Sequence, residues 1–211
     1  MFLFFLLLFS VESCPFDRIN FQTVTTETLV EYYNLNRPFM LYNTNLSLTK
    51  DTFLKQYGNV TLKYGTRDSL RHEGYYAKSE IKVSNIDNVD GLIFTPVKDI
   101  DYDIEIPSPN FIKHMSPYFL DGQIISYGHK KSGINYHWHS KTLLAVIEGE
   151  KEWYIYPPLR ENYIEYNVPN FHAIYCLQKK NTIIFLPEYY WHRTSNRNTV
   201  FAIAWHERYL N

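Results

Sequence analysis

Short apolar and aromatic runs separated by turn residues fill the second half of the chain. Each run is only a few residues long, and a Gly, Pro or Asn lies between most neighbours. Runs of this length bounded by turn signals are typical of β-strands, and many short strands with few helices between them indicate an antiparallel barrel or sandwich. The predicted strands cover residues 123–127, 137–139, 143–147, 153–156, 182–186 and 199–205.

The first half mixes helix and strand signals. Threonines precede two predicted helices, and their hydroxyls can cap the first turn. These helices are expected at about 26–33 and 50–58, and short strands at 18–21, 38–42 and 60–64. Residues 99–106 (DIDYDIEI) alternate charged and apolar side chains, which predicts a further strand with one solvent-exposed face. The fold class is therefore an all-β core with a few, mainly N-terminal, helices.

The N-terminus has the pattern of a targeting signal. Residues 2–9 (FLFFLLLF) are uninterrupted apolar sequence, too short to span a bilayer but of the length of a signal-peptide core. We expect residues 1–13 to be a cleaved signal peptide, with the mature chain starting near Cys14; a buried N-terminal strand is the alternative. The chain has 211 residues without a repeat or linker. Residues 14–211 are then one domain, with a barrel core at about 121–206.

Charge and cysteine content limit the possible partners and the cellular compartment. Lys plus Arg is 21 and Asp plus Glu is 22, so the formal charge of −1 gives no basic face for nucleic acid. Asn45 and Asn59 head acceptor sequons for N-glycosylation. Cys14 and Cys176 could form one disulfide in an oxidising compartment or remain two thiols. We expect a protein of the endoplasmic reticulum lumen or a secreted one, with luminal or secreted proteins as partners and no membrane span after signal cleavage.

A pair of histidines suggests a metal site. Alternate residues of a strand share a face, so His137 and His139 are expected to project together, about 7 Å apart along the chain. Two imidazoles at that spacing can bind one metal ion if a third ligand arrives from elsewhere, and His192 is the natural candidate. The pair alone is also compatible with ordinary surface or core histidines. His206 is interpreted as structural rather than as a ligand.

Three ordered motifs resemble the JmjC-domain and cupin-like family of iron(II)- and 2-oxoglutarate-dependent oxygenases. They are His137-Trp138-His139, the segment GEKEWYIYPP at 149–158, and PEYYWH at 187–192. The resemblance implies a double-stranded β-helix (jelly roll) in which His137, His139 and His192 hold Fe(II). It also implies that Lys151 pairs with 2-oxoglutarate. A luminal branch of the family likewise combines a signal peptide, His-Trp-His and a cysteine upstream of the distal histidine, here Cys176.

Two departures from the family pattern bear on function. His139 stands where the family has Asp or Glu, and three histidines also bind zinc readily. Ile134 stands where many members have a threonine that holds the cosubstrate; Ser126 and Tyr127 on the preceding strand are the candidates to replace its hydroxyl. Lys151 shares strand parity with inward-facing neighbours, although a solvated hairpin lysine is the alternative reading.

Two main functions follow from these observations. The first is a secretory-pathway JmjC-like protein with a degenerate metal site, non-catalytic or weakly active, that works through protein contacts. The alternative is a protein hydroxylase that uses Fe(II) and 2-oxoglutarate. A zinc hydrolase or lyase is a third reading without an evident general base. The tryptophans Trp138, Trp191 and Trp205 are expected to pack in the barrel, with Trp191 beside His192.

Overall fold

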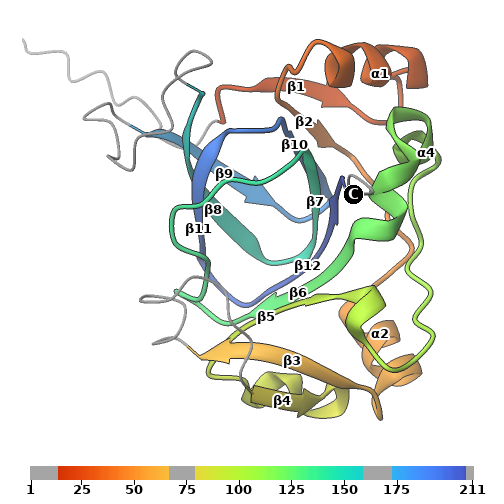
Figure 1. Cartoon of the computed structure of the whole chain (residues 1–211), viewed down its shortest axis with the longest axis vertical. Helices are drawn as coiled ribbons and strands as arrows, with labels where there is room; N and C mark the ends of the chain where they lie inside the picture. The colour runs from red at the N-terminus through yellow and green to blue at the C-terminus, as the bar shows by residue number, and fades with distance from the viewer. Residues whose placement is uncertain (1–13, 67–78, 159–172, 208–211) are drawn as a thin grey trace, which may run out of the picture.

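A computed structural model describes residues 14–66, 79–158 and 173–207. Within them the chain forms two sheets (Figure 1). The larger sheet has the order β1 (Asp17–Asn20), β2 (Phe39–Tyr42), β10 (Thr182–Leu186), β7 (Thr142–Glu148), β12 (Val200–His206), β6 (Gln123–Gly128), β5 (Gly91–Pro96), β3 (Thr61–Thr66), β4 (Ser79–Lys82). The smaller sheet has the order β11 (Trp191–Asn196), β8 (Glu150–Tyr156), β9 (Ile174–Lys179).

The two sheets face each other across an apolar interior. In Figure 1 the strands β11, β8 and β9 lie opposite β7, β12 and β6. Strand β8 shows why they do: its burial alternates strictly, and Trp153 and Ile155 contribute to an interior cluster that includes Leu144 and Ala204 of the larger sheet. When buried and exposed side chains alternate along a strand, one face of its sheet is apolar, and two such apolar faces pack against each other. The predicted jelly-roll, cupin-like fold class is confirmed.

Helices cover the outer face of the larger sheet. They are α1 (Thr26–Asn34), α2 (Lys50–Tyr57) and α4 (Asn110–Met115), with 3₁₀ turns η1 (Val83–Asn88), η2 (Val97–Asp99) and η3 (Pro117–Gly122). Thr25 caps α1 and Thr49 caps α2 through a capping box, as the sequence predicted. Leu29, Phe53 and Phe111 pack from the three helices into the outer core cluster. Because the helices pack outside the larger sheet, the interior between the two sheets is available for the site.

The predicted strand at 99–106 is wrong. Ile104 and Ile106 are buried while Asp103 and Glu105 are exposed, so the alternation of side chains holds in the second half of the segment, whereas Tyr102 is 59% exposed. The segment nevertheless has no strand partner. The hydroxyl of Tyr57 takes that place locally: it accepts from the backbone N–H of Glu105 at 3.1 Å and donates to the carbonyl of Glu105 at 3.2 Å. Extended backbone satisfied by a side chain needs no neighbouring strand.

The histidine pair does not lie on a regular strand either. Of residues 137–139, only His137 makes a β-bridge, and its partner is His192 on β11. Several strands also lie outside the predicted runs, namely β4, β5, β9 and β11. His137 and His139 nevertheless line the same cavity.

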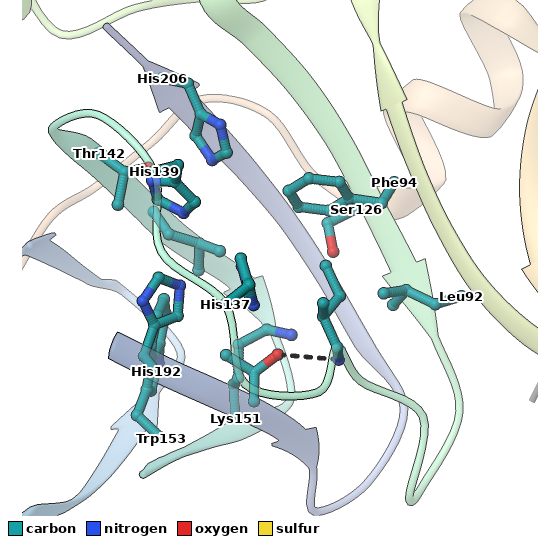
Figure 2. Close-up of a pocket in the computed structure, with 13 residues that line it drawn as sticks. Leu92, Phe94, Ser126, His137, His139, Thr142, Lys151, Trp153, His192 and His206 are labelled. Atoms are coloured by element: carbon teal, nitrogen blue, oxygen red, sulfur yellow. Dashed lines mark hydrogen bonds between the residues drawn. The ribbon is translucent and has the colours of Figure 1, made fainter. Parts of the chain in front are cut away.

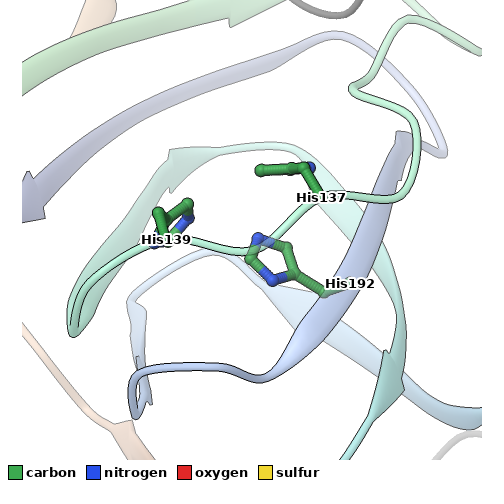
Figure 3. Close-up of side chains that lie close together, drawn as sticks. All are labelled: His137, His139 and His192. Atoms are coloured by element: carbon green, nitrogen blue, oxygen red, sulfur yellow. The ribbon is translucent and has the colours of Figure 1, made fainter. Parts of the chain in front are cut away.

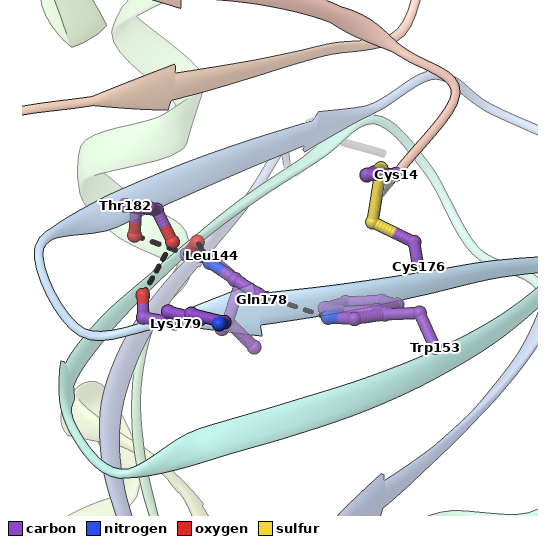
Figure 4. Close-up of a disulfide and its surroundings, with 7 residues drawn as sticks. All are labelled: Cys14, Leu144, Trp153, Cys176, Gln178, Lys179 and Thr182. Atoms are coloured by element: carbon purple, nitrogen blue, oxygen red, sulfur yellow. Dashed lines mark hydrogen bonds between the residues drawn. A yellow bond between two sulfur atoms is a disulfide. The ribbon is translucent and has the colours of Figure 1, made fainter. Parts of the chain in front are cut away.

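A disulfide fixes the start of the described chain. Cys14 is bonded to Cys176 of β9 across 162 residues of sequence (Figure 4). Cys14 and its neighbour Phe16 belong to the interior cluster that also contains Trp153. The proposed signal peptide at 1–13 lies outside the described residues. Among the helices of the described ranges, none combines the length and apolar character needed to cross a membrane.

Candidate metal centre

Three histidines from two neighbouring segments converge inside the sandwich. The backbones of His137 and His192 exchange two hydrogen bonds, of 3.0 and 2.9 Å, which fixes the loop segment against β11. His139 follows two residues later and turns its ring to the same side (Figure 3). One ring nitrogen of each of the three lies within 4.8 Å of the others, close enough for a single metal ion.

The hydrogen bonds of the rings select one tautomer for all three histidines. Nδ1 of His137 lies 2.7 Å from the carbonyl of Asn135, Nδ1 of His139 lies 2.7 Å from that of Ser140, and Nδ1 of His192 lies 2.8 Å from that of Tyr190. A carbonyl only accepts, so each Nδ1 carries the proton and donates it. Each Nε2 is then left with a lone pair. Metal-bound histidines have this same arrangement, with the second nitrogen donating to a carbonyl or carboxylate.

Burial keeps the three rings neutral. Desolvation lowers the pKa of His139 to about 4, and the neighbouring His137 adds to the effect. Desolvation also lowers the pKa of His137 and places that of His192 well below its usual value. Neutral imidazoles are the ligating form, so protons compete weakly for this site near neutral pH.

Aromatic side chains wall the triad, and sequence reasoning named them only in part. The ring of Trp153 lies 5.4 Å from that of His192, whereas Trp191 was expected there. His206 stacks on His139 with ring centroids 4.1 Å apart. Trp138 is 40% exposed, so its predicted barrel packing is wrong. Trp153 lies on the same face of β8 as Lys151, and this alternation in the sequence would have predicted that its ring points inward.

Lys151 points into the interior, as the resemblance implied. The side chain is 2% exposed, and Nζ donates to Oδ1 of Asn196 at 2.8 Å. The Asn196 amide in turn donates to the carbonyl of Gly128 and to the hydroxyl of Ser132, both at 3.0 Å. Burial lowers the pKa of Lys151 to about 8. The solvated-hairpin reading is wrong, and Asn196 is a site residue that the sequence did not indicate.

The triad and Lys151 line one narrow cavity (Figure 2). Its free volume is about 20 Å³, the space of about one water molecule. Leu92, Phe94, Ile134 and Ser126 also line it. A metal ion fits the histidine donors. The residue at position 134 is Ile134, so no hydroxyl stands there to hold 2-oxoglutarate as the family threonine does.

The remaining predicted residues lie at separate places. Asn45 and Asn59 are exposed on the surface. The hydroxyl of Tyr127 donates to Asp87, and Tyr127 does not line the cavity, so of the two residues named to replace the family threonine Ser126 is the one that lines it. The sequence prediction that Cys14 and Cys176 could pair is confirmed.

The fold and the site define a double-stranded β-helix protein with a candidate metal centre of three histidines. Among curated proteins, JmjC domain-containing protein 8 of Homo sapiens is 29% identical over 88 residues, covering 35% of this chain and 33% of that protein. The proteins of the same name from Rattus norvegicus and Mus musculus are 27% and 28% identical over 87 and 94 residues, covering 35% of this chain and 32% of each relative. These matches support membership of this chain in the JmjC family.

The extent of the similarity is limited. The matches span about a third of the length of the curated relatives. No protein-family model matches the chain. The expected likeness to the luminal branch of the family thus rests on these matches together with the three ordered motifs.

Proposed function

We propose that this chain is a secretory-pathway JmjC-like protein that binds a metal ion through three histidines and works through protein contacts rather than 2-oxoglutarate turnover. The main observation in support of metal binding is that all three histidines have the same tautomer. Each Nδ1–H is donated to a backbone carbonyl, which leaves the lone pair of each Nε2 free, and one ring nitrogen of each histidine lies within 4.8 Å of the others. Three neutral imidazoles suit zinc as well as iron(II).

The cavity argues against the cosubstrate. Lys151 already gives one of its three N–H donors to Asn196, and Asn196 is itself held by two further hydrogen bonds. Ile134 offers no hydroxyl, and the apolar side chains of Leu92 and Phe94 also line the cavity that the dicarboxylate would have to enter. The hydroxylase remains the second candidate because Lys151 is buried without a carboxylate partner among the described residues.

Two exposed aromatic rings beside the site support the proposed protein contacts. Trp138 lies between two of the histidines and is 40% exposed, and Tyr189, three residues before His192, is 49% exposed. Their ring centroids are 5.2 Å apart. Tryptophan and tyrosine are enriched in protein interfaces because they bury a large area with few rotatable bonds.

The Cys14–Cys176 disulfide supports an oxidising compartment.

Metal and cosubstrate titrations of the purified mature chain test the proposal. We expect zinc and iron(II) each to bind with a stoichiometry of one, and anaerobic addition of 2-oxoglutarate to the iron(II) form to produce no metal-to-ligand charge-transfer band. His192→Ala should abolish metal binding, and His114→Ala, which removes an exposed histidine of α4, should leave it unchanged. A saturable charge-transfer band would favour the hydroxylase. Equal metal content in the wild type and the His192 variant would refute the metal site.

The contact surface needs its own measurement. Trp138→Ser and Tyr189→Ser should reduce crosslinking to luminal proteins in cells while metal content stays unchanged. Tyr102→Ser is the matched control because Tyr102 is 59% exposed and lies on a loop outside the metal cavity. If all three variants crosslink like the wild type, this surface does not serve as the contact site.

A further inference from the structure

The last residue of β12 contacts the ligand that replaces the family carboxylate. The ring of His206 stacks on that of His139 with centroids 4.1 Å apart and an angle of 29° between the planes. Phe94 of β5 lies next to His206, 5.8 Å between centroids. Figure 2 shows His206 above His139 at the wall of the cavity. His206 is not among the three histidines whose ligand atoms lie within 4.8 Å of one another.

The end of β12 also holds the backbone around His139. The N–H of Glu207 donates to the carbonyl of Lys141 at 2.9 Å, and the Ser140 hydroxyl donates to the carbonyl of Glu207. Residues 138–141 belong to no strand, so these contacts take the place of a sheet ladder. Two contacts at the end of β12 therefore hold His139 in place. Glu207 bonds to the residues that follow His139, and the ring of His206 packs on the ring of His139.

We infer that His206 is a positioning residue for His139, and that it orients the third ligand by ring stacking rather than by binding the metal. The inference rests on the proposed metal binding. The Nδ1–H of His139 is bonded to the carbonyl of Ser140, which holds one edge of the ring, and packing against the face of the ring restrains its tilt. A flat ring at 4.1 Å supplies that restraint. It also gives a physical role to histidine at position 139, because a carboxylate is too short to form this stack.

Two substitutions of His206 separate stacking from ligation. His206→Phe keeps a flat ring without nitrogens, and His206→Leu fills the space without a ring. We expect zinc affinity, measured by competition with a chromophoric chelator, to stay within about threefold for the Phe variant. It should fall about 10- to 100-fold for the Leu variant, the usual effect of losing an outer-shell partner. The visible absorption of bound cobalt(II) should change for Leu alone.

Val146→Ala provides the matched control for lost packing. Val146 is buried in the same interior but does not line the cavity. This variant should lower the urea midpoint as a core truncation does, while the zinc affinity and the cobalt(II) spectrum remain those of the wild type.

Each outcome decides the inference. Wild-type affinity and spectrum in both His206 variants would show that the stack positions nothing. An equal loss in both would show that the nitrogens of His206 are needed, as for a fourth ligand, and would also overturn it. If the wild type itself binds no metal, the proposed function is wrong and this inference falls with it.

Discussion

Replacing Lys151 with methionine tests whether a charged ammonium is buried without an anion. Methionine keeps an unbranched side chain and removes the charge. In the folded protein the pKa of Lys151 is lowered by burial from 10.5 to about 8. Below about pH 8 both the folded and the unfolded chain carry the proton, so the cost of burying the charge is present in full. Between about pH 8 and 10.5 only the unfolded chain keeps it, and the free energy of unfolding rises with pH.

The pKa interval fixes the size of this effect. The difference between 10.5 and about 8 corresponds to about 3 kcal/mol. Lys151→Met should lose this pH dependence. Near pH 7 the variant escapes the cost of the buried charge but leaves Oδ1 of Asn196 without its donor, which costs about 1 to 3 kcal/mol. We therefore expect the two proteins to differ by no more than about 2 kcal/mol at neutral pH.

Urea unfolding of both proteins across this pH interval measures the effect. The quantity of interest is the wild-type free energy of unfolding minus that of the variant, because groups that titrate in both proteins cancel. A difference that does not change with pH would refute the reasoning about Lys151. Adding 2-oxoglutarate should leave the difference unchanged. If the dicarboxylate instead removed the pH dependence, it would be pairing with Lys151, and the hydroxylase would become the better reading.

Three further predictions concern the triad, the disulfide and the sequons. His192→Ala should weaken zinc binding by more than the roughly 10- to 100-fold that outer-shell changes produce, as isothermal titration would show; a smaller loss would mean that His192 is not a ligand. Removal of the Cys14–Cys176 bridge by a double Ala substitution should lower the free energy of unfolding by about 4 to 5 kcal/mol, given the 162 residues it spans. Unchanged urea midpoints would contradict that estimate. In a secretory expression host, Asn45→Gln and Asn59→Gln should each remove one glycosidase-sensitive mass step, since both side chains are exposed; a wild-type chain insensitive to the glycosidase would disprove the luminal assignment of these sequons.

The elements that the sequence revealed are those with local signals. The cap at Thr49 and the end at Gly58 predicted α2, and the apolar run at 182–186 coincides with β10. These signals depend on neighbouring residues only, so tertiary structure had little to change. The run at 99–106 shows the limit of the same reasoning, because alternation predicts which side chains are buried but not whether a partner strand exists.

Strand β11 was missed for a reason that belongs to the site. Its sequence WHRTSN lacks an apolar alternation, since the inward-facing positions are His192, Thr194 and Asn196, which line or adjoin the cavity. A strand that supplies polar groups to a site loses the hydrophobic period by which strands are recognised. The pairing of Asn196 with Lys151 follows from the register of β11 on β8, so it could not be deduced without that strand.

The changes around the cavity share one chemical direction. A histidine at position 139 gives the site one negative charge fewer than the family carboxylate would, and Ile134 offers no hydroxyl. Asn196 accepts one of the three N–H donors of Lys151. The first two changes remove features that the family uses for oxygen activation and for the cosubstrate, whereas Lys151 itself is kept. None disturbs the three Nδ1–H bonds to backbone carbonyls that leave the Nε2 lone pairs free. The set of histidine donors for a metal is therefore complete, while the contacts that the family uses for the cosubstrate are only partly present.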